Sequence, residues 1–169
     1  MKVNIAQLRR TEGASETYRF SESFPSLQLG NEDYFFQVPV DVQADVTNTG
    51  KSLLVKGKVF SIINVNCSRC LKEYPFHLDF EFEDEWQPAE FAEPDEEEGA
   101  FLFDKDEFCI DNRISEHILL HIPMKFMCSE DCKGLCPKCG ADRNQGSCAC
   151  TDGDIDPRLE ILFQWNKGV

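Results

Sequence analysis

Nine cysteines, most of them in close pairs, are the feature that most constrains this chain of 169 residues. One pair, Cys67 and Cys70, lies mid-chain, and a dense later set follows. The later set is Cys128, Cys132, Cys136, Cys139, Cys148 and Cys150. The N-terminal residues contain no hydrophobic signal region, and the number of cysteines is odd. Paired thiols in a chain without a secretion signal are more typical of metal ligands than of disulfides.

The spacing within the later set points to zinc. Cys136-Pro137-Lys138-Cys139-Gly140 has the pattern of a zinc knuckle. Two thiolates at this spacing can reach one ion at about 2.3 Å. The glycine after the second cysteine permits a tight turn that brings backbone N–H groups toward the sulfurs. The pattern therefore predicts structural zinc.

A closed structural zinc site takes four ligands, so eight paired cysteines form two sets. The local set is Cys136, Cys139, Cys148 and Cys150. The remaining set is Cys67, Cys70, Cys128 and Cys132, which would tie a β-hairpin to the later segment. The alternative is one zinc ion and several free thiols, because the Cys-x-Cys pair is sterically awkward on a single ion. Cys109 is left over and is expected to be a small buried hydrophobe.

Other chemistries fit the sequence less well. The cysteine spacings match no iron–sulfur run, and there is no phosphate-binding glycine loop or Gly-x-Ser-x-Gly. His117 and His121 stand four apart, but without the glutamate pattern of a zinc protease they are expected to be ordinary helix-face residues. An all-cysteine site has no position for an activated water. The sequence therefore predicts no catalytic residues and a protein that is not an enzyme.

Alternation of apolar residues predicts antiparallel strands between Tyr34 and Trp86. Apolar residues alternate through residues 38–46, 53–65 and 74–86, with a turn at Asn48-Thr49-Gly50 and a possible bulge at Gly57. The last strand should carry acids on its open face, and residues 18–24 should add an edge strand. Asp111 can cap a short helix that ends before Pro123, and Asp156-Pro157 can start a last helix. The expected fold class is α+β: an antiparallel sheet, a short helix and a Cys-rich zinc-binding C-terminal segment.

The net charge of −14 is concentrated in one segment. Between Asp79 and Glu107 there are fourteen acids and one base, so the rest of the chain is close to neutral. Residues 87–99, with two prolines and the run Asp95-Glu96-Glu97-Glu98, are expected to form a solvated spacer. The predicted domains are a β domain at 1–86, an acidic linker at 87–108 and a helix with the Cys-rich segment at 109–169. No run approaches the roughly 20 apolar residues of a membrane span, so a cytoplasmic protein without membrane contact is expected.

The order of the motifs resembles the YceD family, the bacterial large-ribosomal-subunit RNA accumulation proteins with chloroplast relatives. The resemblance rests on four stretches, in this order: Asn66-Cys67-Ser68-Arg69-Cys70-Leu71; Leu120-His121-Ile122-Pro123; residues 132–140 with Cys148-Ala149-Cys150; and Asp156-Pro157-Arg158-Leu159. It covers roughly residue 31 onward. It implies a role in the accumulation, processing or stability of 23S ribosomal RNA, with the pre-50S particle, that RNA or a basic ribosomal protein as partner.

Basic residues near the cysteines could contact RNA phosphates if the second set of four forms. They are Arg69, Lys72, Lys133, Lys138 and Arg143. Alternatively these cations serve solubility or offset the charge of a zinc tetrathiolate. Two further functions stay open: an acidic carrier that holds a basic ribosomal protein through Asp95 to Glu98, and a chaperone that releases zinc on oxidation.

Overall fold

A computed structural model describes residues 1–29, 32–91, 101–104 and 106–150 of the chain. It divides into two compact units. The β unit comprises Met1–Asn66 and Glu73–Phe126, and the Cys unit comprises Cys67–Lys72 and Met127–Val169. The expected domains at 1–86, 87–108 and 109–169 divide the chain differently, since the helix falls in the β unit and residues 67–72 fall in the Cys unit.

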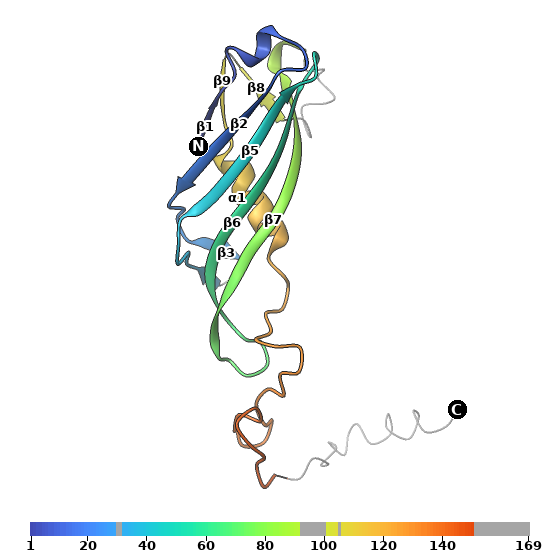
Figure 1. Cartoon of the computed structure of the whole chain (residues 1–169). Helices are drawn as coiled ribbons and strands as arrows, with labels where there is room; N and C mark the ends of the chain where they lie inside the picture. The colour runs from blue at the N-terminus through green and yellow to red at the C-terminus, as the bar shows by residue number, and fades with distance from the viewer. Residues whose placement is uncertain (30–31, 92–100, 105, 151–169) are drawn as a thin grey trace, which may run out of the picture. The chain divides into compact units, whose positions relative to one another are not determined.

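The β unit is built on a five-stranded sheet in the order β2-β5-β6-β7-β8 (Figure 1). The bounds are Ser15–Glu22 for β2, Val40–Asn48 for β5, Leu53–Asn66 for β6, Glu73–Pro88 for β7 and Phe101–Phe103 for β8. Neighbours from β2 to β7 pair antiparallel, whereas β7 and β8 pair parallel. The three long strands and the edge strand predicted from alternation are confirmed, but the sheet is mixed and not wholly antiparallel.

Shorter elements complete the β unit. Lys2–Asn4 (β1) pairs with Glu107–Cys109 (β9), and Leu27–Leu29 (β3) pairs with Glu32–Tyr34 (β4), both antiparallel. One-turn 3-10 helices occupy Leu8–Arg10 and Ala89–Phe91. The one α-helix among the described residues, α1, spans Asp111–His121. It lies behind the sheet in Figure 1. No helix in the described part of the chain has the length and apolar character needed to cross a bilayer.

The core lies between α1 and one face of the sheet. Val42, Val55 and Val59 of the sheet are buried, as are Ile114 and Ile118 of α1. These isoleucines stand four residues apart, which places them on one face of the helix. The helix ends where expected, before Pro123, but Asp111 does not cap it: Ile110 occupies the N-cap position, and no side chain caps the helix there.

Gly57 marks a close approach and not the bulge expected from the sequence. It pairs in continuous register with Ala44 on one side and Phe82 on the other. A Cβ atom at residue 57 would lie 2.4 Å from the Phe82 ring and 2.8 Å from the Gln43 carbonyl oxygen. Glycine is therefore required because the Phe82 ring lies over this backbone.

Two predictions along the chain fall partly or wholly outside the described residues. The expected spacer at 87–99 is described only to Phe91, and this part continues β7 to Pro88 and then forms the 3-10 turn. After the undescribed residues, Phe101–Phe103 pairs with Trp86–Pro88 as β8. The helix expected from Asp156-Pro157 lies outside the described residues.

Candidate metal centres

The Cys unit brings eight cysteines together as two groups of four. The first Cys group contains Cys67, Cys70, Cys128 and Cys132, and the second Cys group contains Cys136, Cys139, Cys148 and Cys150. Within each group all four sulfurs lie within 4.8 Å of one another. These are the two sets that the sequence grouped, and either could hold a metal ion.

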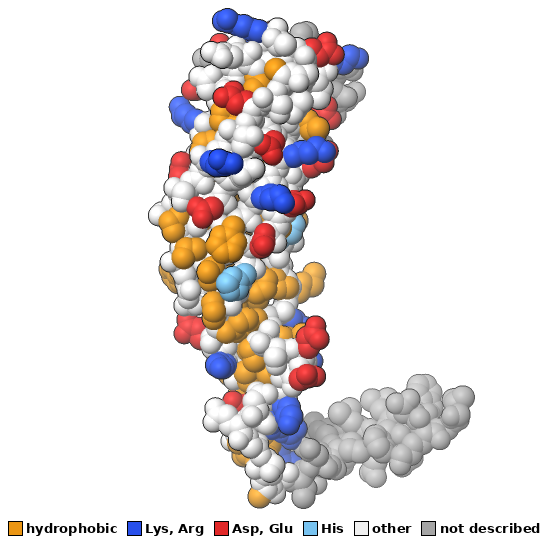
Figure 2. Space-filling model, in the orientation of Figure 1, with side chains coloured by type: hydrophobic (Ala, Val, Ile, Leu, Met, Phe, Trp, Pro, Cys, Tyr) orange, Lys and Arg blue, Asp and Glu red, His pale blue; other side chains and the backbone are white. Residues whose placement is uncertain are grey.

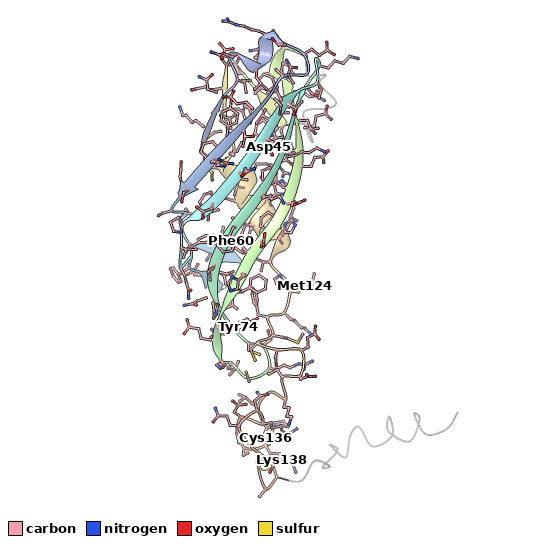
Figure 3. The ribbon with its side chains drawn as sticks, in the orientation of Figure 1. Asp45, Phe60, Tyr74, Met124, Cys136 and Lys138 are labelled. Carbon is pink, nitrogen blue, oxygen red and sulfur yellow. The ribbon has the colours of Figure 1, made fainter. Side chains whose placement is uncertain are left out.

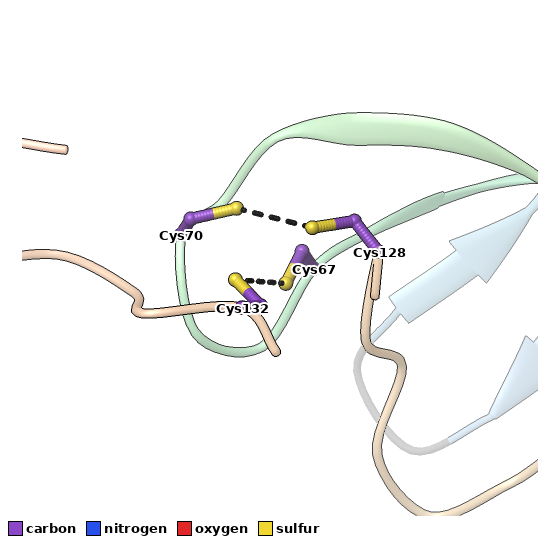
Figure 4. A group of neighbouring side chains, drawn as sticks. All are labelled: Cys67, Cys70, Cys128 and Cys132. Atoms are coloured by element: carbon purple, nitrogen blue, oxygen red, sulfur yellow. Dashed lines mark hydrogen bonds between the residues drawn. The ribbon is translucent and has the colours of Figure 1, made fainter. Parts of the chain in front are cut away.

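The first Cys group has the dimensions of a tetrahedral site (Figure 4). The Sγ atoms of Cys67 and Cys132 are 3.8 Å apart, and those of Cys70 and Cys128 are 3.7 Å apart. A tetrahedron of sulfurs around zinc at about 2.3 Å has edges of roughly 3.8 Å. The observed separations therefore fit four thiolates on one ion, and they are far longer than the roughly 2.05 Å bond of a disulfide.

Each group is built on a knuckle, and the two knuckles have the same backbone geometry. The N–H of Leu71 donates to the Cys67 carbonyl at 2.8 Å, and the N–H of Gly140 donates to the Cys136 carbonyl at 2.8 Å. Leu71 has φ 58° and Gly140 has φ 73°, so both turns close through the left-handed region. The sequence revealed only the second turn, because its glycine is the residue that suits this conformation; leucine at the first gives no such signal.

Backbone donors set the ionisation of the first cysteine in each knuckle. Burial raises the pKa of Cys67, but N–H donors from Cys128, Cys70 and Arg69 outweigh it, and the pKa is lowered to about 6. Backbone N–H groups of Cys139 and Lys138 likewise lower the pKa of Cys136 to about 6. Each knuckle is therefore arranged to stabilise a thiolate at its first position.

One thiol in each group, Cys128 in the first and Cys150 in the second, resists ionisation. The pKa of Cys128 is raised to about 12, first by its hydrogen bond to Cys132 and then by burial. The pKa of Cys150 is raised to about 12, first by its hydrogen bond to Cys139 and then by burial. Four crowded thiols cannot all lose their protons without a compensating charge. A divalent cation supplies that charge, and this is the chemistry that the donor sets fit.

The two groups differ in exposure. Cys67, Cys70 and Cys132 of the first Cys group are buried and Cys128 is half-buried. In the second Cys group only Cys136 is buried, and Cys139 is exposed. Oxidants and chelators therefore have easier access to the second Cys group.

Two polar side chains contact the sulfurs, and one of them, Asn144, links the two groups. Asn144 lies in the loop between Cys139 and Cys148, yet its Nδ2 donates to the Cys132 sulfur of the first group at 3.5 Å. Its Oδ1 accepts the Lys133 N–H at 2.8 Å. Arg143 Nη2 lies 4.0 Å from the Cys136 sulfur. Such contacts orient ligands and are not visible in cysteine spacing, so sequence reasoning missed Asn144.

Cys109 is not the buried hydrophobe that the sequence led us to expect. It is exposed, and its Sγ donates to Asp111 Oδ2 at 2.7 Å. The alternation of β9 explains this, because Phe108 and Ile110 face the core and the residue between them faces outward.

The two histidines of α1 have structural contacts, in line with the expectation from sequence. The Nε2 of buried His117 lies 2.9 Å from Asp84 Oδ2. The His121 ring stacks on Phe80 with centroids 4.0 Å apart. Arg113 adds two N–H donors to Asp84 Oδ1, at 3.0 and 2.9 Å. Asp84 is thus a buried carboxylate held between a guanidinium and an imidazole.

All five basic residues proposed for RNA contact lie in the Cys unit. Lys133 and Arg143 line a polar hollow of about 390 Å³ with Asn144 and Gln145. Arg69 donates from Nη1 to the Cys132 carbonyl at 2.9 Å. Lys72 and Lys138 are exposed; Figure 3 labels Lys138 beside Cys136. Arg69 and Arg143 therefore support the Cys groups, whereas the three lysines carry exposed charge.

Comparison with known proteins decides the family. A family profile described as "Large ribosomal RNA subunit accumulation protein YceD" matches residues 55–164. The chain belongs to the YceD family. This confirms the resemblance drawn from the motifs, and the match spans both Cys groups.

Two curated relatives, from Arabidopsis thaliana and Zea mays, are each named "Large ribosomal RNA subunit accumulation protein YCED homolog 1, chloroplastic". The Arabidopsis protein is 28% identical over 147 residues, and the match covers 70% of this chain and 46% of the relative. The maize protein is 31% identical over 149 residues, with 70% and 51% covered. This YceD-family chain thus spans about half the length of these relatives. No solved structure matches it significantly.

Proposed function

We propose that this chain is a non-enzymatic factor that favours accumulation of 23S ribosomal RNA during assembly of the large ribosomal subunit. Membership of the YceD family carries the proposal, together with the names of the plant relatives. The Cys unit is the part that we assign to RNA contact, and the pre-50S particle is its expected partner.

Zinc is the metal that the donor sets favour. Four thiolates in tetrahedral arrangement suit zinc. The sulfur separations in the first Cys group match those of a tetrahedron with the usual zinc–sulfur bond length. A closed set of four protein ligands gives a structural ion without an open coordination position. Bound zinc would order the Cys unit and so fix the basic side chains around the two groups.

The exposed lysines would contact RNA phosphates. Lys133 lines the polar hollow, and Lys72 and Lys138 are exposed in the same unit. Their contacts would position the protein on RNA without reading its sequence. The competing explanation is that these cations only offset the charge of the zinc tetrathiolates. Replacing the lysines separates the two explanations: it should reduce RNA binding while both zinc ions stay bound.

The proposal is tested in a strain that lacks the gene. The deletion should lower 23S relative to 16S ribosomal RNA, and the intact gene should restore the ratio. A variant with Lys72→Glu, Lys133→Glu and Lys138→Glu should fail to restore it, provided that it still folds and binds zinc. The matched control is Lys2→Glu with Lys51→Glu, which reverses two exposed lysines of the β unit. An unchanged 23S to 16S ratio in the deletion strain, under slow and fast growth alike, would overturn the proposal.

A redox-switched chaperone is the second candidate, and the exposure of Cys139 favours it. It predicts that peroxide releases zinc and creates the ability to hold an unfolding client in solution. The absence of such activity before and after peroxide would remove this candidate.

A further inference from the structure

The sheet of the β unit has an open face that no described residue covers. Helix α1 packs on the other face, and Figure 2 views the molecule from the open side. Side chains alternate between the two faces along each strand, and residues paired across neighbouring strands lie on the same face. Phe60 of β6, labelled in Figure 3, lies on it and is 40% exposed.

A hollow of about 500 Å³ lies beside Phe60. Its lining includes Arg19 of β2, Asp41 of β5, Lys58 of β6 and Asp79 of β7. A second hollow of about 340 Å³ also involves Lys58 and extends the surface to Asp45, Glu81 and Glu83. The hollows and the exposed aromatic ring provide a place for a large apolar side chain.

The charge on this face is unbalanced once its ion pairs are counted. Lys58 pairs with Glu81 at 2.5 Å, and Lys56 pairs with Glu83 at 3.0 Å. Five further acids on the face make no ion pair with a described residue: Asp41, Asp45, Glu73, Asp79 and Glu85. Against them stands one base, Arg19, which donates to Gln43 at 3.3 Å. The face therefore presents an excess of negative charge around an apolar hollow.

We propose that this open face docks a lysine- or arginine-rich protein segment that places one large apolar side chain beside Phe60. The excess acids attract cationic side chains, and Phe60 with the hollow gives the apolar anchor. RNA is disfavoured here because its phosphates would face those acids. A second copy of this chain is disfavoured because two acidic faces repel each other. This docking surface is separate from the Cys unit and does not depend on RNA contact there.

Binding of short labelled peptides to the full zinc-loaded chain tests the proposal. The probe is a peptide of about ten residues that alternates lysine and serine around a central tryptophan. One matched peptide replaces the tryptophan by serine, and another replaces the lysines by glutamate. The full probe should bind best, and its amide shift changes should map to β2, β5, β6 and β7 and not to α1.

Variants of the chain then separate the apolar and charged contributions. Phe60→Ser should weaken the tryptophan peptide about fivefold to tenfold but hardly change the peptide without tryptophan. Asp41→Asn with Asp79→Asn should weaken both lysine peptides about twofold to fivefold. Asp33→Asn, on the β3–β4 hairpin, is the matched control and should leave binding unchanged.

Three outcomes would overturn the proposal. The first is unchanged affinity in the Phe60 and aspartate variants when circular dichroism shows that they fold. The second is loss of binding only when Asp95 to Glu98 are neutralised. The third is that single-stranded RNA displaces the peptide and itself causes amide shift changes on this face of the sheet.

Discussion

At the scale of single residues, exchanging leucine and glycine between the two knuckles tests whether backbone strain affects zinc binding. Leu71 and Gly140 occupy equivalent turns, with φ 58° and 73°. A residue other than glycine in this region costs about 1–2 kcal/mol. The Leu71 side chain is 66% exposed, so removing it eliminates few packing contacts.

The strain predicts opposite effects at the two positions. Leu71→Gly should raise the zinc affinity of the first Cys group by about fivefold, since about 1 kcal/mol of strain is released. Gly140→Leu should lower that of the second Cys group by a similar factor. Competition with a chromophoric chelator measures both. A change of zinc affinity in the same direction in both variants would contradict the equivalence of the two turns.

Gly57 gives a second prediction at this scale. Gly57→Ala would place a methyl group 2.4 Å from the Phe82 ring, within the continuous pairing of β5, β6 and β7. The ring and strands must shift, so the β unit should lose about 1–3 kcal/mol of unfolding free energy. Urea unfolding followed by circular dichroism measures the loss. Gly146→Ala is the control, because nothing lies within 4 Å of the added atom there. A β unit as stable as the original would show that Phe82 can move freely.

Asp84 shows what the sequence could reveal about residues and what it could not. Apolar residues occupy every second position from Tyr74 to Trp86 except position 84, and this period places Asp84 on the packed face. A charged residue at a core-facing position of a strand indicates that a polar or oppositely charged partner lies in the core. Its partners, Arg113 and His117, come from a helix distant in sequence, and no local pattern identifies them.

At the scale of elements, strand length decides how much the sequence predicts. Strands β5, β6 and β7 are long enough for their alternation to be read directly. Strands β1, β3, β4, β8 and β9 have three residues each, too few to establish a period. The knuckle at Cys136 was predictable because proline and glycine mark it. The grouping of Cys67 and Cys70 with Cys128 and Cys132 followed from counting ligands, and the structure brings these sulfurs together.

The two knuckles predict two zinc ions, each of which can be removed without the other. Native mass spectrometry of the purified chain should show two zinc ions. Cys136→Ser should leave one ion and loosen the second Cys group, while Cys67→Ser should remove the ion of the first. Structural zinc contributes on the order of 10 kcal/mol to small sites, so each loss should be cooperative within its group.

Cys109→Ser is the control for both substitutions, since exposed Cys109 belongs to neither group. It should retain two zinc ions. The sheet should survive every one of these changes, because the β unit has its own core. A folded, metal-free chain with protected disulfides would refute zinc ligation altogether.

At the scale of the whole molecule, the two units carry different charge. The stretch from Asp79 to Glu107, which belongs to the β unit, holds fourteen acids and one base. Among its described residues the Cys unit holds five bases and three acids. An overall charge of −14 therefore hides a unit whose exposed lysines can approach an anion. The acidic stretch would keep the rest of the protein away from RNA, which limits contact to the Cys unit.

This separation makes the salt dependence of RNA binding a measure of which unit is used. RNA affinity should be modest and should fall as salt rises, because phosphate contacts release counterions. Each lysine–phosphate contact contributes about 0.7 to the slope of log affinity against log salt for a single strand. Replacing Lys72, Lys133 and Lys138 by glutamine should therefore flatten the slope by about two. The variant with Lys56→Gln and Lys58→Gln should keep the original slope, since those lysines already pair with Glu83 and Glu81. Equal flattening in the two variants would mean that RNA contact is not confined to the Cys unit.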